Sequence, residues 1–287
     1  MLTTNEIHVR DPFVLVDNGV YYLYGSRGWE TWGLCTGIDV YCSTDLEHWE
    51  GPIEVFTPPK DFWSNMHFWA PEVHAYEGAY YLFISFKSES RHRGTQILRA
   101  ESPMGPFLPI SEGPVTPEDW ECLDGTLYVD EKGDPYMIFC HEWTQVGNGE
   151  MCLMPLSRDL TRRMGEPKVL FRAGDLPWIK SLTEGKEDYC TDGPFLYTTK
   201  DGVLLMLWSS YSESGYTVAQ ATAVDGHVNG RWVHADALVS DCDGGHGMLF
   251  RTFDGALTFV MHKPNVPGQE RPCFVPATDI GDGIRLG

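Results

Sequence analysis

Five short motifs that place an acid or a histidine beside glycine or proline recur along the chain. They are Arg10-Asp11-Pro12, Ala70-Pro71-Glu72, Leu123-Asp124-Gly125, Asp192-Gly193-Pro194 and Gly245-His246-Gly247. Carboxyls gathered in one cleft can perform acid–base chemistry, because burial and like-charge repulsion separate their pKa values, so that one holds a proton while another stays ionised. A single copy would be explained as an acid that caps a turn, but five copies in phase favour a common site.

Each motif opens a pair of expected strands. In the first copy an alternating apolar run follows Asp11, Asn18-Gly19 supplies a turn, and Tyr21–Tyr24 forms an aromatic-rich second strand. A unit of roughly fifty to seventy residues with this period-two alternation is typical of a repeat architecture. In a β-propeller the first strand of every blade lines the central channel. The sequence therefore predicts an all-β, five-bladed β-propeller that forms a single domain over residues 1–287, with the five polar residues at one end of the channel.

The chain carries a formal net charge of -20 and a sequence pI near 4.7. This charge repels nucleic-acid phosphates and anionic lipid surfaces, so neither nucleic acid nor a membrane is expected as a partner. No apolar run approaches the length that a membrane span requires. A neutral oligosaccharide is the simplest partner, and the sequence does not indicate the oligomeric state.

The amino-terminal residues Met1–Glu6 lack the basic and apolar regions of a secretory signal. The eight cysteines are spread without CxxC spacing, which is typical of reduced, buried thiols. Both features favour a cytoplasmic protein, although a secreted chain without its signal peptide would look the same. No organic cofactor is expected. One way to close the ring would be for the first residues to add a strand to the last blade.

Aromatic residues are dense before the second motif, in Asp61–Trp69. Aromatic faces stack on the apolar C–H faces of sugars, so we expect Trp69 to face a carbohydrate, whereas Trp63 is equally well explained by packing between blades. His141-Glu142-Trp143 ends the second strand of the third unit. We expect Trp143 to face the cleft and bind substrate, with a surface ion pair as the alternative explanation of His141 and Glu142.

The motifs, in this order and with this spacing, resemble those of glycoside hydrolase family 43. The resemblance includes Trp69-Ala70-Pro71-Glu72 and extends to Ser43–Trp49 and Ser102–Phe107, so that it covers nearly the whole chain. It implies a five-bladed propeller and an inverting hydrolase that cleaves arabinofuranosyl or xylosyl linkages in plant-derived oligosaccharides. We expect exo action on short substrates.

The resemblance also assigns residues. Asp11 would be the general base that activates water, and Asp124 would orient the general acid and tune its pKa. His246 would lie near the channel axis, where family members often hold a hydrated calcium or other ion. Arg271 resembles an arginine near the substrate. Glu72 is interpreted as a substrate-binding group, with a second candidate acid as the equal alternative.

One position departs from the family pattern. The general acid is usually a glutamate before Gly-Pro, whereas this chain has Asp192. A carboxyl one methylene shorter reaches less far, and a displacement of about 1 Å can lower a rate about a hundredfold. We expect Asp192 to serve as the acid because the rest of its motif is intact. The alternatives are another acid, such as Glu187 or Glu142, or a catalytically weak carbohydrate-binding propeller that retains the shape of the site.

Overall fold

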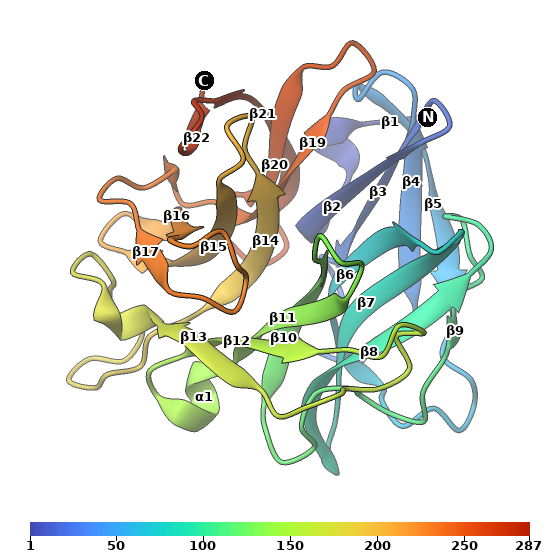
Figure 1. Cartoon of the computed structure of the whole chain (residues 1–287). Coiled ribbons are helices and arrows are strands. Elements are labelled where there is room, and N and C mark those ends of the chain that lie inside the picture. Colours follow the sequence, from blue (N-terminus) through green and yellow to red (C-terminus); the bar gives the residue numbers. More distant parts are fainter.

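A computed structural model describes residues 1–287 as five antiparallel sheets around a central axis (Figure 1). This arrangement confirms the predicted five-bladed β-propeller. Blade one contains β1 (Leu2–Thr3), β2 (Val9–Asp17), β3 (Val20–Arg27), β4 (Ile38–Ser43) and β5 (His48–Phe56). Blade two contains β6 (Met66–Tyr76), β7 (Ala79–Ser88), β8 (Arg91–Ala100) and β9 (Leu108–Pro109).

The remaining blades follow in chain order. Blade three contains β10 (Cys122–Val129), β11 (Pro135–His141), β12 (Glu150–Pro155) and β13 (Lys168–Arg172). Blade four contains β14 (Asp192–Thr198), β15 (Leu204–Ser212), β16 (Gly215–Ala223), β17 (Trp232–His234) and β18 (Ser240–Asp241). Blade five contains β19 (Gly245–Arg251), β20 (Leu257–Lys263), β21 (Arg271–Asp279) and β22 (Ile284–Leu286). Helical structure is limited to η1 (Thr4–Glu6), α1 (Trp143–Val146) and η2 (Ala173–Asp175).

The ring closes without an exchanged strand, so the suggested strand from the first residues to the last blade is wrong. Strand β1 pairs with β5 of its own blade, where Leu2 faces Trp49. The Trp49 indole N–H also donates to the Thr4 hydroxyl at 3.0 Å, which holds the amino terminus on blade one. Blades one and five meet instead through side chains, including the hydrogen bond from the Phe253 backbone N–H to the Tyr21 hydroxyl at 2.9 Å.

The innermost strand of every blade contains an irregularity at the same place. Register shifts interrupt the pairing of β2, β6, β10, β14 and β19 with their neighbours. Each blade has a residue with a positive φ at the equivalent shift, in order Asp11, Ala70, Asp124, Gly193 and His246, and blade two has a further one, His67, at its additional shift. Such bulges bend a strand and redirect a side chain, so Asp11, Asp124 and His246 occupy equivalent positions. Asp192 precedes the equivalent position by one residue and Glu72 follows it by two.

Apolar side chains fill the spaces between neighbouring blades. Phe56, Phe68 and Phe86 pack between blades one and two, and Trp208 packs against Phe171 between blades three and four. Trp49 is fully buried between blades one and five. Each such side chain contributes about 2–3 kcal/mol by leaving water, which keeps the inner strands fixed around the channel. None of the helices has the length and apolar character to cross a membrane.

Candidate active site

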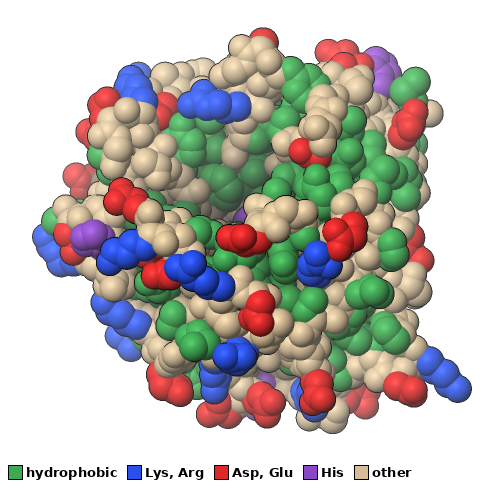
Figure 2. Space-filling view, turned by 45° about the vertical axis from the view of Figure 1, so that its right-hand side comes forward, with side chains coloured by type: hydrophobic (Ala, Val, Ile, Leu, Met, Phe, Trp, Pro, Cys, Tyr) green, Lys and Arg blue, Asp and Glu red, His purple; other side chains and the backbone are tan.

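A cleft of about 360 Å³ opens at one end of the channel. It contains six of the residues expected at the site, namely Asp11, Asp124, Asp192, Trp69, Trp143 and His246. Its remaining lining residues are Arg10, Thr31, Trp32, His67, Arg93, Leu123, Glu142, Thr144, Leu182, Cys190 and Tyr211. The space-filling view shows acidic, basic and apolar side chains intermingled on one face of the molecule (Figure 2). The cleft therefore combines charged groups with aromatic surface.

Asp11 is buried and held from several sides. The Ser26 hydroxyl donates to Asp11 Oδ2 at 2.7 Å, and His246 Nδ1 lies 3.3 Å from Asp11 Oδ1. Burial alone would raise the pKa of Asp11, but its charged neighbours lower it to about 2. His262 also faces Asp11 but is neutral. Its Nδ1 accepts the Asp11 backbone N–H at 3.2 Å, and burial lowers its pKa to about 3. The low pKa of Asp11 therefore depends on His246 and Arg10, and Asp11 is ionised near neutral pH.

Asp124 and Asp192 form a second, different pair of carboxyls. Burial is the main cause that raises the pKa of each, and the charge of Asp192 raises the pKa of Asp124 further. The two groups are linked through the Gly193 backbone N–H, which donates to Asp124 Oδ2 at 2.9 Å. The Tyr216 hydroxyl donates to Asp192 Oδ2 at 3.0 Å, which orients this carboxyl. Two interacting carboxyls with raised pKa values retain a shared proton near neutral pH.

His246 lies between the two sets of carboxyls. Its Nδ1 is 3.6 Å from Asp124 Oδ2 as well as 3.3 Å from Asp11 Oδ1. Burial opposes protonation of His246, but the surrounding carboxylates outweigh it and raise its pKa. No group of three or more His, Cys, Asp or Glu side chains is arranged to hold a metal ion. The donors therefore do not fit a directly ligated ion, and the hydrated ion near the axis stays a prediction on which no catalytic step depends.

Glu72 lies behind the cleft, because its position two residues beyond the bulge turns it into the channel. It lines a separate cavity of about 10 Å³ together with Asp11 and His246, which is about the volume of one water molecule. His74 Nε2 is 3.0 Å from Glu72 Oε2. Glu72 therefore does not line the cleft, and its role as a substrate-binding group stays a prediction.

Arg271 also lies outside the cleft. Its guanidinium donates to the backbone oxygens of Asn5, at 2.7 Å, and Glu270, at 2.8 Å. Arg271 therefore holds η1 against blade five, and its expected contact with substrate is corrected. The arginines that line the cleft are Arg10 and Arg93. Arg10 donates to Glu270 Oε1 at 2.9 Å and to Asn265 Oδ1 at 3.0 Å.

Trp69 is fixed in the cleft wall by the imidazole of His67 and the guanidinium of Arg93. His67 stacks on it with ring centroids 4.6 Å apart, and the Arg93 guanidinium lies 4.0 Å from its centroid. Arg93 Nη2 contacts His67 Nδ1 at 3.0 Å, so both neighbours cover the same face of the indole. The edge of Trp32 contacts Trp69 at 5.3 Å between centroids. The pair of tryptophans gives the cleft a rigid aromatic wall.

The two alternative acids lie in different places. Glu142 is buried in the cleft, where it is ion-paired with Arg93, and burial is the main cause that raises its pKa. Glu187 is exposed and does not line the cleft. The connection that contains Glu187 contributes Leu182 instead. Trp63 packs against Phe86 outside the cleft.

Several cleft residues were not expected from the sequence. Trp32 is 59% exposed and lies on the connection between β3 and β4, and the Arg10 guanidinium lies 5.5 Å from its ring centroid. Arg93 and Tyr211 come from β8 and the end of β15, away from the repeated motifs. In the sequence, the only indication that Trp32 belongs to a binding site is that it stands close to Trp29 in a segment without strand periodicity.

Comparisons with known proteins agree with this geometry. The model of the family described as "Glycosyl hydrolases family 43" matches residues 4–278. The crystal structure of an endo-arabinase from Bacteroides thetaiotaomicron VPI-5482 superposes with a TM-score of 0.89 at 39% sequence identity, covering 96% of each chain.

Two curated relatives match a shorter region. The extracellular endo-alpha-(1->5)-L-arabinanase 1 of Bacillus subtilis (strain 168) is 26% identical over 153 residues, which are 50% of this chain and 46% of the relative. Xylosidase/arabinosidase 43A of Humicola insolens is 27% identical over 156 residues, again 50% of this chain and 46% of the relative. The matched regions thus span about half the length of these relatives.

Proposed function

Because the chain belongs to glycosyl hydrolase family 43, we propose that it hydrolyses arabinofuranosyl linkages in plant-derived oligosaccharides with inversion of the anomeric centre. The observation that carries this proposal is the opposite perturbation of carboxyls within one cleft. The pKa of Asp11 is lowered to about 2, whereas burial raises the pKa values of Asp124 and Asp192. An inverting glycosidase needs one ionised and one protonated carboxyl.

In the proposed reaction Asp11 removes a proton from a water molecule as the water oxygen attacks the anomeric carbon. Asp192 donates its proton to the glycosidic oxygen, which leaves as the hydroxyl of the departing sugar. Asp124 does not react with substrate. It accepts the Gly193 backbone N–H next to Asp192, and the two coupled carboxyls share the proton that Asp192 donates.

The choice of sugar follows from the relatives. The structure that is 39% identical is described as an endo-arabinase, and the two curated relatives are described as an arabinanase and a xylosidase/arabinosidase. Arabinofuranosyl linkages are therefore proposed first and xylosyl linkages second. Exo action remains the proposal from the sequence, and endo action is a second candidate that the endo-arabinase similarity favours.

The test is a substrate panel with analysis of products. The wild type should release arabinose, or short arabino-oligosaccharides if it acts internally, and proton NMR should detect the inverted anomer before mutarotation. Asp11→Asn should be inactive on the same panel. If no glycoside is cleaved and calorimetry still detects oligosaccharide binding, the carbohydrate-binding propeller replaces this proposal. Retention of anomeric configuration would contradict the inverting mechanism.

A further inference from the structure

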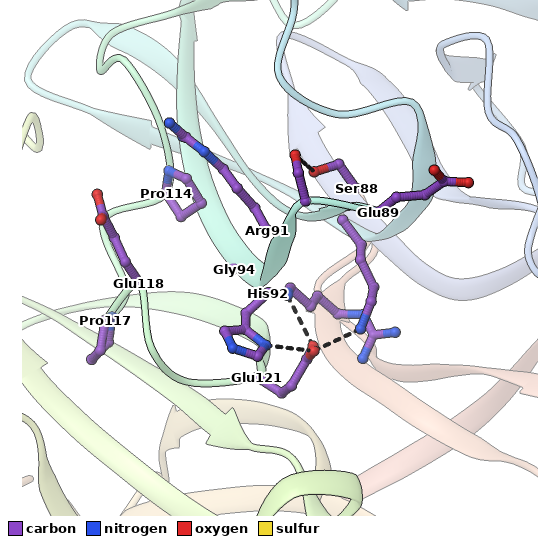
Figure 3. Close-up of a pocket in the computed structure, with 12 residues that line it drawn as sticks. Ser88, Glu89, Arg91, His92, Gly94, Pro114, Pro117, Glu118 and Glu121 are labelled. Carbon is purple, nitrogen blue, oxygen red and sulfur yellow. Dashed lines mark hydrogen bonds and ion pairs between the residues drawn. The ribbon is translucent and has the colours of Figure 1, made fainter.

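A second, larger cavity lies beside the catalytic cleft (Figure 3). Its volume is about 500 Å³, and no hydrophobic residue lines it. We call it the distal pocket. It is lined by Lys87, Ser88, Glu89, Ser90, Arg91, His92, Arg93, Gly94, Pro114, Pro117, Glu118 and Glu121. This half-open hollow is lined by polar and charged residues together with Pro114 and Pro117, and packing of the propeller core does not fill it.

The distal pocket opens on the same end of the propeller as the cleft. Met66, at the start of β6, pairs with Lys87 near the end of β7. The turn that connects β7 to β8 therefore lies at the same end of blade two as the start of β6. Arg93 lines both cavities. It contacts Glu142 and His67 on the cleft side, and its backbone N–H donates to Glu121 at 2.9 Å on the other side. Arg93 is therefore a shared wall between neighbouring cavities.

The polar groups of the distal pocket are partly organised in advance. Lys87 Nζ lies 2.7 Å from Glu121 Oε1, and His92 Nδ1 lies 2.9 Å from the same oxygen (Figure 3). Burial alone would raise the pKa of Glu121, but the hydrogen bonds from Lys87, His92 and the Arg93 backbone lower it to about 2. Glu121 is therefore ionised and holds two side chains at the edge of the pocket with further N–H groups free to donate.

Arg91 provides a second, unpaired group. No carboxylate lies within ion-pair distance of its guanidinium, which is positioned 5.8 Å from the ring centroid of Trp63. The Ser88 and Ser90 hydroxyls, 3.4 Å apart, belong to the same turn. Arginine in this setting offers a planar set of donors to paired oxygen atoms. The pocket thus presents donors and acceptors at several points of its wall.

We propose that the distal pocket binds a neutral glycosyl unit of the same substrate chain, remote from the bond that is cleaved. This inference depends on the proposed function of the cleft. A neutral sugar fits better than an anion because Glu89, Glu118 and Glu121 offset the cationic residues of the pocket. Vicinal sugar hydroxyls both donate and accept hydrogen bonds and sugar C–H groups need apolar contact, which matches a wall of mixed polar groups beside Pro114 and Pro117.

The test compares substrates of different length in Arg91→Ala and Lys87→Ala. Both variants should lower kcat/KM for arabinohexaose about fivefold to tenfold, the effect of losing one ordinary protein hydrogen bond. The same variants should leave hydrolysis of an aryl arabinofuranoside unchanged, because that substrate is too short to reach past Arg93. Arg158→Ala is the matched control, since its side chain is 72% exposed and lies outside the pocket. Equal losses on both substrates, or no loss on either, would overturn the proposal.

Binding separates this proposal from the proposed function. In an Asp11→Asn background, calorimetry with arabinohexaose should show weaker binding when Arg91→Ala is added, whether or not the wild type is a hydrolase. Unchanged binding of arabinohexaose in this background would overturn the distal pocket even if the wild type hydrolyses arabinan. Absence of hydrolysis by the wild type, with weaker binding in the Arg91→Ala variant, would instead overturn only the hydrolase assignment.

Discussion

The catalytic cleft and the distal pocket share Arg93, but they use charge in opposite ways. In the cleft the side chains of Asp11 and Asp124 are only 9% and 5% exposed, and their pKa values are shifted in opposite directions. In the distal pocket the side chains of Lys87 and His92 are 26% and 49% exposed. Buried charge is suited to proton transfer because its surroundings set its pKa, whereas exposed charge is suited to reversible binding.

The largest effect is expected from Asp11→Asn. Asparagine keeps the size of the side chain and its contact with Ser26 but cannot accept a proton from water. We expect kcat/KM for arabino-oligosaccharides to fall about 10³-fold, since general-base catalysis contributes effects of this order. Steady-state kinetics, with circular dichroism as a check of folding, measures this. Activity within a few-fold of the wild type would remove Asp11 from the reaction and erase the functional contrast between the two regions.

The next effect separates the two candidate acids of the cleft. We expect Asp192→Asn to lower kcat/KM for unactivated oligosaccharides about 10²-fold but to lower it little for aryl glycosides, whose leaving groups need no proton. Glu142→Gln serves as the matched comparison, because Glu142 is also buried and has a raised pKa. If only Glu142→Gln shows this dependence on the leaving group, Glu142 is the acid and Asp192 has a different role.

The contrast between buried and exposed charge can also be measured as stability. Glu270 is 1% exposed and pairs with Arg10 at 2.9 Å, so Glu270→Ala removes the closest carboxylate from a buried cation and leaves only Asp11 at 3.9 Å. We expect this to lower the free energy of unfolding by about 3–5 kcal/mol, compared with about 1 kcal/mol or less for Lys87→Ala in the distal pocket. Urea denaturation provides both values. Similar losses for the two variants would show that burial does not distinguish the two regions.

The smallest expected effect is a gradual dependence on pH. Asp11 is ionised above a pKa of about 2, so it does not limit activity near neutral pH. The raised pKa values of Asp124 and Asp192 mean that activity is lost as pH rises through the titration of this pair, about tenfold per pH unit. Stability follows the same direction for this pair, because between the unfolded and folded pKa values the folded state binds more protons. A kcat/KM profile that already declines above the ordinary carboxyl value near 3.8 would contradict the raised pKa values.

The repeated motifs predicted the five blades because period-two alternation and turn residues are local properties of the chain. They also placed Asp11, Asp124, Asp192 and His246 at one end of the channel. They did not predict that Glu72 turns away, because the direction of a side chain depends on its position relative to the bulge. One residue before the bulge, Asp192 enters the cleft, whereas two residues after it, Glu72 enters the channel.

Residues outside the motifs were harder to identify. Trp32 lies in an irregular connection where no periodicity indicates orientation, and Arg93 reaches the cleft from β8 through tertiary packing alone. Arg271 was placed by resemblance, but its hydrogen bond to Asn5 keeps it on the outer side of blade five. Such placements depend on how neighbouring blades meet, which a single sequence does not encode in a local pattern.

Every pair of neighbouring blades except one is joined by the chain itself. Blades one and five meet only through noncovalent contacts, among them the bonds of Arg10 to Glu270 and of the Asp11 backbone to His262. The ring therefore has a seam, and Asp11, the proposed general base, lies on it. Partial opening of this seam would displace Asp11 while the other four junctions stayed intact. Heat would then inactivate the protein before it melts, and a ligand that bridges the seam would protect both properties together.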